Sequence, residues 1–287
     1  MFPLAIISDE ISQDFGYACE VASRQFAVGW IELRSLWDKN IASLNSDEIA
    51  EAVRLLKKHD LRVIAIAGPL FKVDWPGAPR SKHNQQRDQF NAGFTYAQQA
   101  EVLDRSIALA KTFGAGCVRC FDFWRLHDPS PYREAMNETL QSAAEKAGKS
   151  GITLLLENEH ACNTATGAEA AEVLAAVKSR FLMLNWDPGN AAMAGDMPYP
   201  NGYNLLPKDR IGHCHCKDVA TKGTEREWAE VGRGMIDWAG QFAALKRDGY
   251  RHAISLETHW RGAGTAEASS VRSWAGMKKA LQKAGSL

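Results

Sequence analysis

Four residues of metal-ligating type recur at regular intervals in the second half of the sequence. Glu157, Asp187 and Glu257 each end a short apolar run, and His215 lies in a fourth. The intervals are 30, 28 and 42 residues, about one strand and one helix each. Three carboxylates and one imidazole form a hard, anionic donor set. This set favours one divalent ion, Mn²⁺ before Mg²⁺ or Co²⁺, with Zn²⁺ as a further option.

The elements that would position these residues alternate along the whole chain, because short β-type runs are followed by longer stretches with apolar residues at helical spacing. Eight such runs predict a single (β/α)8 TIM barrel domain over residues 1–287, with the four donors at one mouth. The expected strands are Leu4 to Ser8, Trp30 to Arg34, Arg62 to Ala67, Cys117 to Phe121, Ile152 to Glu157, Phe181 to Asp187, Ile211 to Cys216 and Ala253 to Glu257.

Several helix ends are also marked in the sequence. Asn45 or Ser46 can cap one helix, Pro131 can open another, and Thr166 with Glu169 forms a capping box. Asp237 can cap the penultimate helix. The long segment from Gly68 to Gln99 follows the third strand, so it is either a solvated excursion or a lid that carries Phe71 and Trp75.

Two cysteine patterns suggest other chemistry. The run His213-Cys214-His215-Cys216 has a spacing of two, which puts the histidines on one face of a strand and the cysteines on the other, unlike a zinc finger. Cys117 and Cys120 form a CxxC inside a β-type run, and not at a helix start where redox motifs lie. We therefore expect reduced, structural thiols.

Charge and composition narrow the class of partner. The 34 basic residues balance 34 acidic ones, so we expect binding neither to nucleic acid nor to a membrane. The apolar run from Phe2 to Ile7 lacks a basic leader, which argues against a signal peptide. We expect a cytoplasmic protein with a small-molecule carbohydrate as its partner. The sequence leaves open whether it is a homo-oligomer.

The sequence resembles the xylose isomerase-like TIM barrel family of sugar isomerases and epimerases, which includes ketose 3-epimerases and inosose dehydratases. The likeness spans nearly the whole chain. It rests on Ile-Ile-Ser-Asp-Glu-Ile at the first strand, Glu32-Leu33-Arg34, Leu-Glu-Asn at Glu157, Asp187-Pro188-Gly189-Asn190, the run from His213 to Asp218, the run from Gly232 to Trp238, and Leu256-Glu257.

The resemblance implies that Glu157, Asp187, His215 and Glu257 are the metal ligands, and it selects His215 over His213. It also implies that the ion binds two adjacent oxygens of a ketose while Glu157 and Glu257 move a proton on opposite faces of the substrate. The physical case agrees, since a polarised carbonyl acidifies the neighbouring C–H bond.

Further residues are candidates for substrate binding, namely His160, Asn190, His213, Lys217 and Arg233. Asn190 stands where ketose 3-epimerases carry a histidine, and this difference argues against that subfamily. The short Gly-rich run from Arg261 to Thr265 precedes a helix, so it is either a plain loop or a phosphate site.

The leading hypothesis from the sequence is a metal-dependent isomerase or epimerase of a sugar, ketose or polyol. The alternative is a lyase of the same family, either an inosose-type dehydratase or a keto-glycoside deglycosidase. A DNA-repair endonuclease would need more histidines than the eight present and a basic DNA-binding face. A non-catalytic sugar binder would be favoured by the loss of a ligand, and all four ligands are present.

Overall fold

A closed barrel of eight parallel strands forms the centre of the computed structural model, which describes residues 1–79, 81 and 88–287. The order of the strands round the barrel is β1-β12-β9-β8-β7-β6-β5-β2. Their bounds are β1 Leu4–Ile7, β2 Trp30–Leu33, β5 Arg62–Leu70, β6 Cys117–Cys120, β7 Thr153–Glu157, β8 Leu182–Trp186, β9 Ile211–Cys216 and β12 Ile254–Leu256. Each coincides with one of the expected strands to within a few residues, so the predicted (β/α)8 barrel is confirmed.

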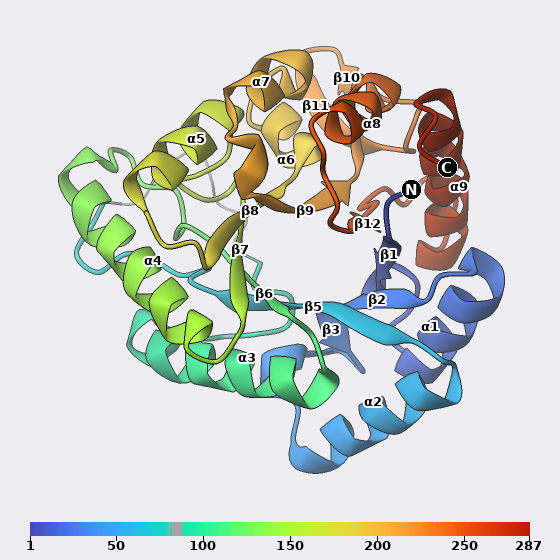
Figure 1. Cartoon of the computed structure of the whole chain (residues 1–287), viewed down its shortest axis with the longest axis horizontal. Coiled ribbons are helices and arrows are strands. Elements are labelled where there is room, and N and C mark those ends of the chain that lie inside the picture. Colours follow the sequence, from blue (N-terminus) through green and yellow to red (C-terminus); the bar gives the residue numbers. More distant parts are fainter. Residues whose placement is uncertain (80, 82–87) are drawn as a thin grey trace.

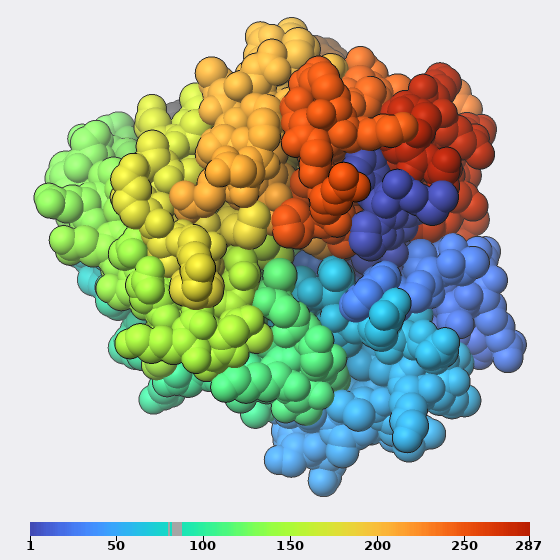
Figure 2. Space-filling model, viewed as in Figure 1, coloured from blue at the N-terminus to red at the C-terminus, as the bar shows by residue number. Residues whose placement is uncertain are grey.

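Helices form a ring round these strands (Figure 1). The colours in Figure 2 follow one another round the molecule, so consecutive strand–helix units occupy neighbouring sectors. The helices are α1 Phe15–Val21, α2 Ser46–Lys58, α3 Gln99–Phe113, α4 Arg133–Gly148, α5 Gly167–Ala176, α6 Pro188–Met193, α7 Tyr203–Leu205, α8 Trp238–Arg247 and α9 Ala266–Lys283. Among the described residues, no helix has the length and apolarity needed to cross a bilayer.

The helix ends follow the sequence signals. Asn45 and Glu48 form a capping box at the start of α2, and Thr166 and Glu169 form one at the start of α5. Asp237 caps α8 by accepting a hydrogen bond from the backbone N–H of Gly240. Pro131 lies in a single 3₁₀ turn, Ser130–Tyr132, directly before α4. These caps fix where each strand–helix unit begins and ends.

Two small hairpins were not expected from the sequence. One follows β2 and consists of β3 Ser35–Leu36 and β4 Lys39–Asn40, and the other follows β9 and consists of β10 Asp218–Lys222 and β11 Glu225–Ala229. Both extend from the carboxyl ends of barrel strands, where the active sites of these barrels lie. They add side chains to the same mouth as the four candidate ligands.

The long segment after the third barrel strand begins with three more residues of β5 than expected, because that strand runs to Leu70. The rings of Phe71 and Trp75 pack against Phe123, with centroids 5.3 and 4.8 Å apart. Phe90, further along, lies with its ring 4.3 Å from the guanidinium of Arg34. The expected lid also includes residues 80 and 82–87, which lie outside the described residues.

Candidate metal centre

The four predicted ligands converge at the mouth of the barrel. Glu157 is the last residue of β7, Asp187 follows β8 directly and caps α6, His215 lies in β9, and Glu257 follows β12. One nitrogen or oxygen atom of each lies within 4.8 Å of the corresponding atoms of the other three. His215 Nδ1 is 3.0 Å from Glu257 Oε2, 3.6 Å from Glu157 Oε1 and 3.7 Å from Asp187 Oδ2. All four residues are at most 1% exposed.

Two of the converging oxygens lack an aligned hydrogen bond with the described residues. Asp187 Oδ2 and Glu257 Oε2 are buried, and neither accepts a hydrogen bond from the part of the chain that the structure describes. Buried carboxylate oxygens normally have such partners, and their absence here suits coordination of a cation. Three carboxylates and an imidazole are also a donor set that a hard divalent ion prefers. The residues present therefore fit one divalent metal ion.

Arginines hold the outer oxygens of the two glutamates. Arg119 donates from Nη1 to Glu157 Oε2 at 3.0 Å, and Arg34 donates to Glu257 Oε1. The other oxygen of each glutamate, Glu157 Oε1 or Glu257 Oε2, faces the cluster. Burial raises the pKa of Glu157, but Arg119 and His215 together outweigh this effect, so the pKa lies below its usual value. The arginines therefore keep both glutamates oriented and Glu157 ionised.

Lys217 brings a buried ammonium group to the same cluster. Its Nζ lies 2.8 Å from Asp187 Oδ2 and 2.5 Å from Glu257 Oε2, in ion pairs that lack the alignment of a hydrogen bond. Burial alone would raise the pKa of Glu257, but Lys217 and His215 hold it well below its usual range. A Cβ at Gly189 would lie 2.2 Å from Lys217 Cγ, so a glycine is needed there for the lysine side chain to pass.

His160 and Asn190 lie beside Glu157, as the sequence led us to expect for the substrate pocket. Asn190 Nδ2 donates to Glu157 Oε1 at 3.0 Å, and its Oδ1 lies 3.3 Å from His160 Nδ1. His160 Nδ1 is also 2.8 Å from Glu159 Oε1, and its side chain is 37% exposed. Burial lowers the pKa of His160, but Glu159 outweighs that effect and raises it overall. An exposed ring beside a metal ligand is well placed to meet a substrate.

The structure places the other two candidate substrate residues elsewhere. His213 is 2% exposed, and its Nε2 lies 3.2 Å from Glu32 Oε2 inside the barrel. Arg233 is exposed at a cavity of about 440 Å³ beside α8 and α9. Its loop is wrapped round Asp218, whose Oδ2 accepts from the N–H groups of Gly232 and Gly234, and this turns Arg233 outward. Neither residue lies among the four donors.

The remaining motifs of the sequence are structural. Burial raises the pKa of the Cys117 thiol to about 11, and Cys120 is buried in the core, so the CxxC is unreactive. Cys214 and Cys216 also belong to the hydrophobic core. In the glycine-rich loop, Arg261 Nη1 pairs with Glu10 Oε2 at 3.0 Å, so the charge of this arginine is already engaged by a carboxylate.

A polar cavity next to Glu257 was not expected from the sequence. It has a volume of about 290 Å³, and it is lined by Asp9, Glu10, Gln13, Arg34, Ser35, Asp88, Phe90, Asn91, His259 and Arg261. His259 Nε2 lies 3.1 Å from Glu257 Oε1, so the cavity adjoins the metal centre. Its residues come from segments after β1, β2, β5 and β12, and only the fold brings them together.

The comparisons with known proteins agree with this architecture. The family model of the xylose isomerase-like TIM barrel matches residues 22–280, and a search of curated proteins finds no match. An L-ribulose 3-epimerase structure is 22% identical with a TM-score of 0.67, and the alignment covers 99% of this chain and 97% of that one.

Two further structures are each 17% identical to the chain. The probable 3-DHS dehydratase AsbF from Bacillus anthracis has a TM-score of 0.70 over 97% of this chain and 98% of its own. The IOLI protein with a bound zinc atom has a TM-score of 0.72 over 99% and 98%. At these identities the structures support the fold alone. Since the family model covers most of the sequence, the chain belongs to the xylose isomerase-like TIM barrel family.

Proposed function

We propose that the protein is a divalent-metal-dependent isomerase or epimerase of a sugar, ketose or polyol. The observation that carries this proposal is the pair Glu157 and Glu257, each with one oxygen held by an arginine and the other facing the donor cluster. Strands β7 and β12 are separated by β8 and β9 in the barrel, so the two carboxylates approach the centre from different sides. Removal of a proton on one face of a carbon next to a carbonyl, and delivery of a proton on the other face, can use such a pair.

Glu157, Asp187, His215 and Glu257 would hold the ion, for which we propose Mn²⁺ before Mg²⁺, Co²⁺ or Zn²⁺. When bound, the ion would polarise a carbonyl and an adjacent hydroxyl of the substrate and thereby acidify the C–H bond between them.

The side chains would divide the remaining work. The Glu257 carboxylate is kept ionised by Lys217 and His215, so it can take the proton from carbon. Glu157 is also ionised, so it can return a proton on the other side after it has taken one up from solvent, and Asn190 orients its Oε1 with a hydrogen bond. The Lys217 ammonium lies beside Asp187 and Glu257, where it can donate to a substrate oxygen that gains negative charge.

The cavity beside Glu257 supports a polyhydroxyl substrate. Arg34 pairs with Asp9, Glu10 and Glu257, and Arg261 pairs with Glu10, so the cationic groups of the wall are already neutralised. Hydroxyl groups can donate to such carboxylates and accept from such guanidiniums, whereas a phosphate would meet excess negative charge. We therefore propose a small, uncharged carbohydrate as the partner. Cytoplasmic location and oligomeric state stay predictions.

The alternative is a lyase that removes the same proton and then expels a β-hydroxyl or β-glycosyl group. Two proton donors near the centre support this alternative. The Lys217 ammonium and a protonated His160 could each donate a proton to the leaving oxygen. A similar structure is also that of a probable dehydratase. The mass of the product separates the two reactions, because elimination loses water or an aglycone and isomerisation loses nothing.

The experiment is a screen of ketoses, inososes and 3-keto-glycosides with Mn²⁺-loaded protein in deuterated water. We expect one deuterium at one carbon of an isomerised product, and Glu257→Gln should lose this exchange. Turnover of such a substrate without any deuterium uptake would contradict proton transfer. Full exchange by the Glu257→Gln protein would contradict the role of that glutamate.

A further inference from the structure

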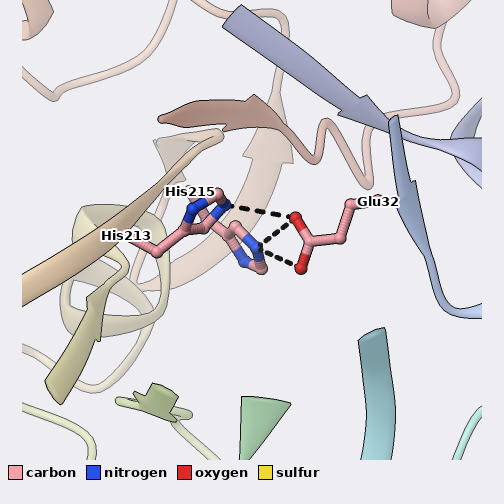
Figure 3. A group of neighbouring side chains, drawn as sticks. All are labelled: Glu32, His213 and His215. Carbon is pink, nitrogen blue, oxygen red and sulfur yellow. Dashed lines mark hydrogen bonds and ion pairs between the residues drawn. The ribbon is translucent and has the colours of Figure 1, made fainter. Parts of the chain in front are cut away.

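A carboxylate inside the barrel contacts the ligand His215 from below the metal centre. Glu32 lies in β2, is 0% exposed, and reaches across to β9, where its oxygens meet both histidines of the His213-Cys214-His215 run (Figure 3). His215 Nε2 lies 3.1 Å from Glu32 Oε2 and 3.3 Å from Oε1, and His213 Nε2 lies 3.2 Å from Oε2. A buried carboxylate is costly unless it accepts hydrogen bonds, so these contacts explain why it is tolerated.

The two nitrogens of His215 have different surroundings. Nδ1 faces the three carboxylates of the metal centre, and Nε2 faces Glu32. An ionised carboxylate can only accept, so Nε2 must carry the hydrogen, and the lone pair of a neutral ring is then on Nδ1. We infer that Glu32 is a positioning residue that fixes the ring and tautomer of His215, so that Nδ1 is the nitrogen that binds the metal. This inference rests on the metal centre proposed above.

Asn185 is a further polar residue next to the His215 ring, and it does not favour a hydrogen on one nitrogen over the other. Its Nδ2 lies 3.1 Å from His215 Nε2 and 3.3 Å from Nδ1, so it is almost equally close to both. Glu32 contacts Nε2 alone, with two oxygens and a full charge. Charge-assisted hydrogen bonds are about twice as strong as neutral ones. The preference for one tautomer therefore comes from Glu32.

His213 also contacts Glu32, and Ser255 contacts His213 in turn. His213 Nε2 lies between Glu32 Oε2 and Ser255 Oγ, which is 2.9 Å away. His213 and His215 therefore contact the same oxygen of Glu32 from neighbouring positions (Figure 3). His213 is therefore a buried residue of the barrel interior and not a ligand of the proposed metal. Substitutions of His213 or Ser255 can serve as controls, because they leave the contact between Glu32 and His215 in place.

A rival interpretation is a second metal ion at Glu32, His213 and His215, because one donor atom of each also lies within 4.8 Å of the others. That ion would need His215 to bridge two metals through its two nitrogens, and no hydrogen would then remain on Nε2. The rival therefore predicts two ions per chain and a ring without an N–H group. Both properties can be measured.

The first experiment compares the metal affinity of four proteins. Affinity for Zn²⁺ is measured by competition with a chromophoric chelator, and affinity for Mn²⁺ by measuring the concentration of free ion during a titration. Glu32→Gln keeps the shape of the side chain but replaces one acceptor with a donor, so affinity should fall about 10- to 100-fold. Ser255→Ala and His213→Gln should stay within about threefold of the unmodified protein. Each protein is checked for folding by circular dichroism and for its melting temperature in chelator.

The second experiment needs no variant and uses ¹⁵N-histidine NMR of the Zn²⁺-loaded protein. We expect one ion per chain, a metal-bound Nδ1 on His215, and a hydrogen on Nε2 that is shifted downfield by its bond to a carboxylate. Ligation through Nε2, two ions per chain, or unchanged affinity in Glu32→Gln would overturn the inference. Absence of any metal binding would overturn the metal centre itself, whereas those three results would leave the centre standing.

Discussion

Two groups of acidic and histidine side chains meet at Glu257, and they have different partners. Glu10, Glu257 and His259 form one group, in which Arg34 pairs with both glutamates and Arg261 with Glu10. In the other, the arginines contact only the outer oxygens of Glu157 and Glu257, and two inner oxygens accept no hydrogen bond from the described residues. In this second group the cation nearest the inner oxygens is the Lys217 ammonium, which pairs with Asp187 and Glu257 without an aligned hydrogen bond. The position of the arginines therefore decides which carboxylate oxygens still face a site for a metal ion.

Substitutions of the glutamates that carry the proton should give the largest effect. Glu157→Gln or Glu257→Gln should lower turnover by about 10²- to 10⁴-fold, because each removes an acid or base beside the reacting carbon. The measurement is deuterium exchange into substrate, with circular dichroism as the control for folding. Near-normal turnover in either variant would show that the two oxygens facing the cluster do not act on the substrate.

Substitution of each histidine of β9 in turn should show which of the two binds the metal. His215→Ala should lose most bound metal on dialysis, because its Nδ1 faces the three carboxylates. His213→Ala should keep more, because its Nε2 faces Glu32 and Ser255. Elemental analysis after dialysis compares them, and the reverse order would mean that the wrong histidine has been assigned to the centre.

A substitution of Glu10 tests the ion pairs of the group Glu10, Glu257 and His259 through the stability of the protein at acidic pH. Burial opposes ionisation, but His259, Arg34 and Arg261 lower the pKa of Glu10 from 4.5 to about 2. A lowered pKa stabilises the folded protein above about pH 4.5, by on the order of 3 kcal/mol, and this contribution is lost as the pH falls toward 2. Glu10→Gln should therefore be less stable at neutral pH and lose less stability on acidification.

Chemical unfolding at a series of pH values from 7 to 3 measures this effect. Glu51→Gln is the matched control, because it changes an exposed glutamate in the surface ion pair with Arg54. That control should follow the acid limb of the unmodified protein. If Glu10→Gln and the unmodified protein lost the same free energy of unfolding between pH 7 and 3, this result would contradict the ion pairs of Glu10.

A smaller effect is expected at Gly189. In Gly189→Ala, the new methyl group would meet Lys217 Cγ at 2.2 Å, so the lysine must move away from Asp187 and Glu257. Such overpacking costs about 1–3 kcal/mol of stability. Thermal unfolding measures it against Gly116→Ala, where a Cβ meets nothing within 4 Å. Equal stability of the two variants would show that the lysine stem is free to shift.

The sequence predicted the barrel and the four donors for one physical reason. Each donor lies at or near the end of a strand, and strands of a parallel barrel share one mouth, so spacing along the chain translates directly into position in space. His160 was a candidate for the pocket because it follows Glu157 within three residues, whereas Asn190 was a candidate because the family resemblance implies a substrate residue three positions after Asp187. Local signals such as the capping box of Thr166 and Glu169 were equally readable.

The partners of those donors were not predictable, because their contacts cross the barrel between residues that are far apart in sequence. Arg119 and Glu32 are charged residues within apolar strands, and this was the one signal that pointed to an inward role. Arg233 was expected near substrate, but the turn round Asp218 faces it outward, and only the backbone hydrogen bonds show this. The cavity beside Glu257 depends on loops from four strands.

The most direct test of the metal centre is the anomalous diffraction of crystals grown with Mn²⁺. We predict a single strong peak among Glu157 Oε1, Asp187 Oδ2, His215 Nδ1 and Glu257 Oε2, with Lys217 Nζ displaced from those oxygens by the charge of the ion. No peak there, or a peak between Glu10 and His259, would contradict the conclusion that the inner oxygens of this cluster mark the metal site.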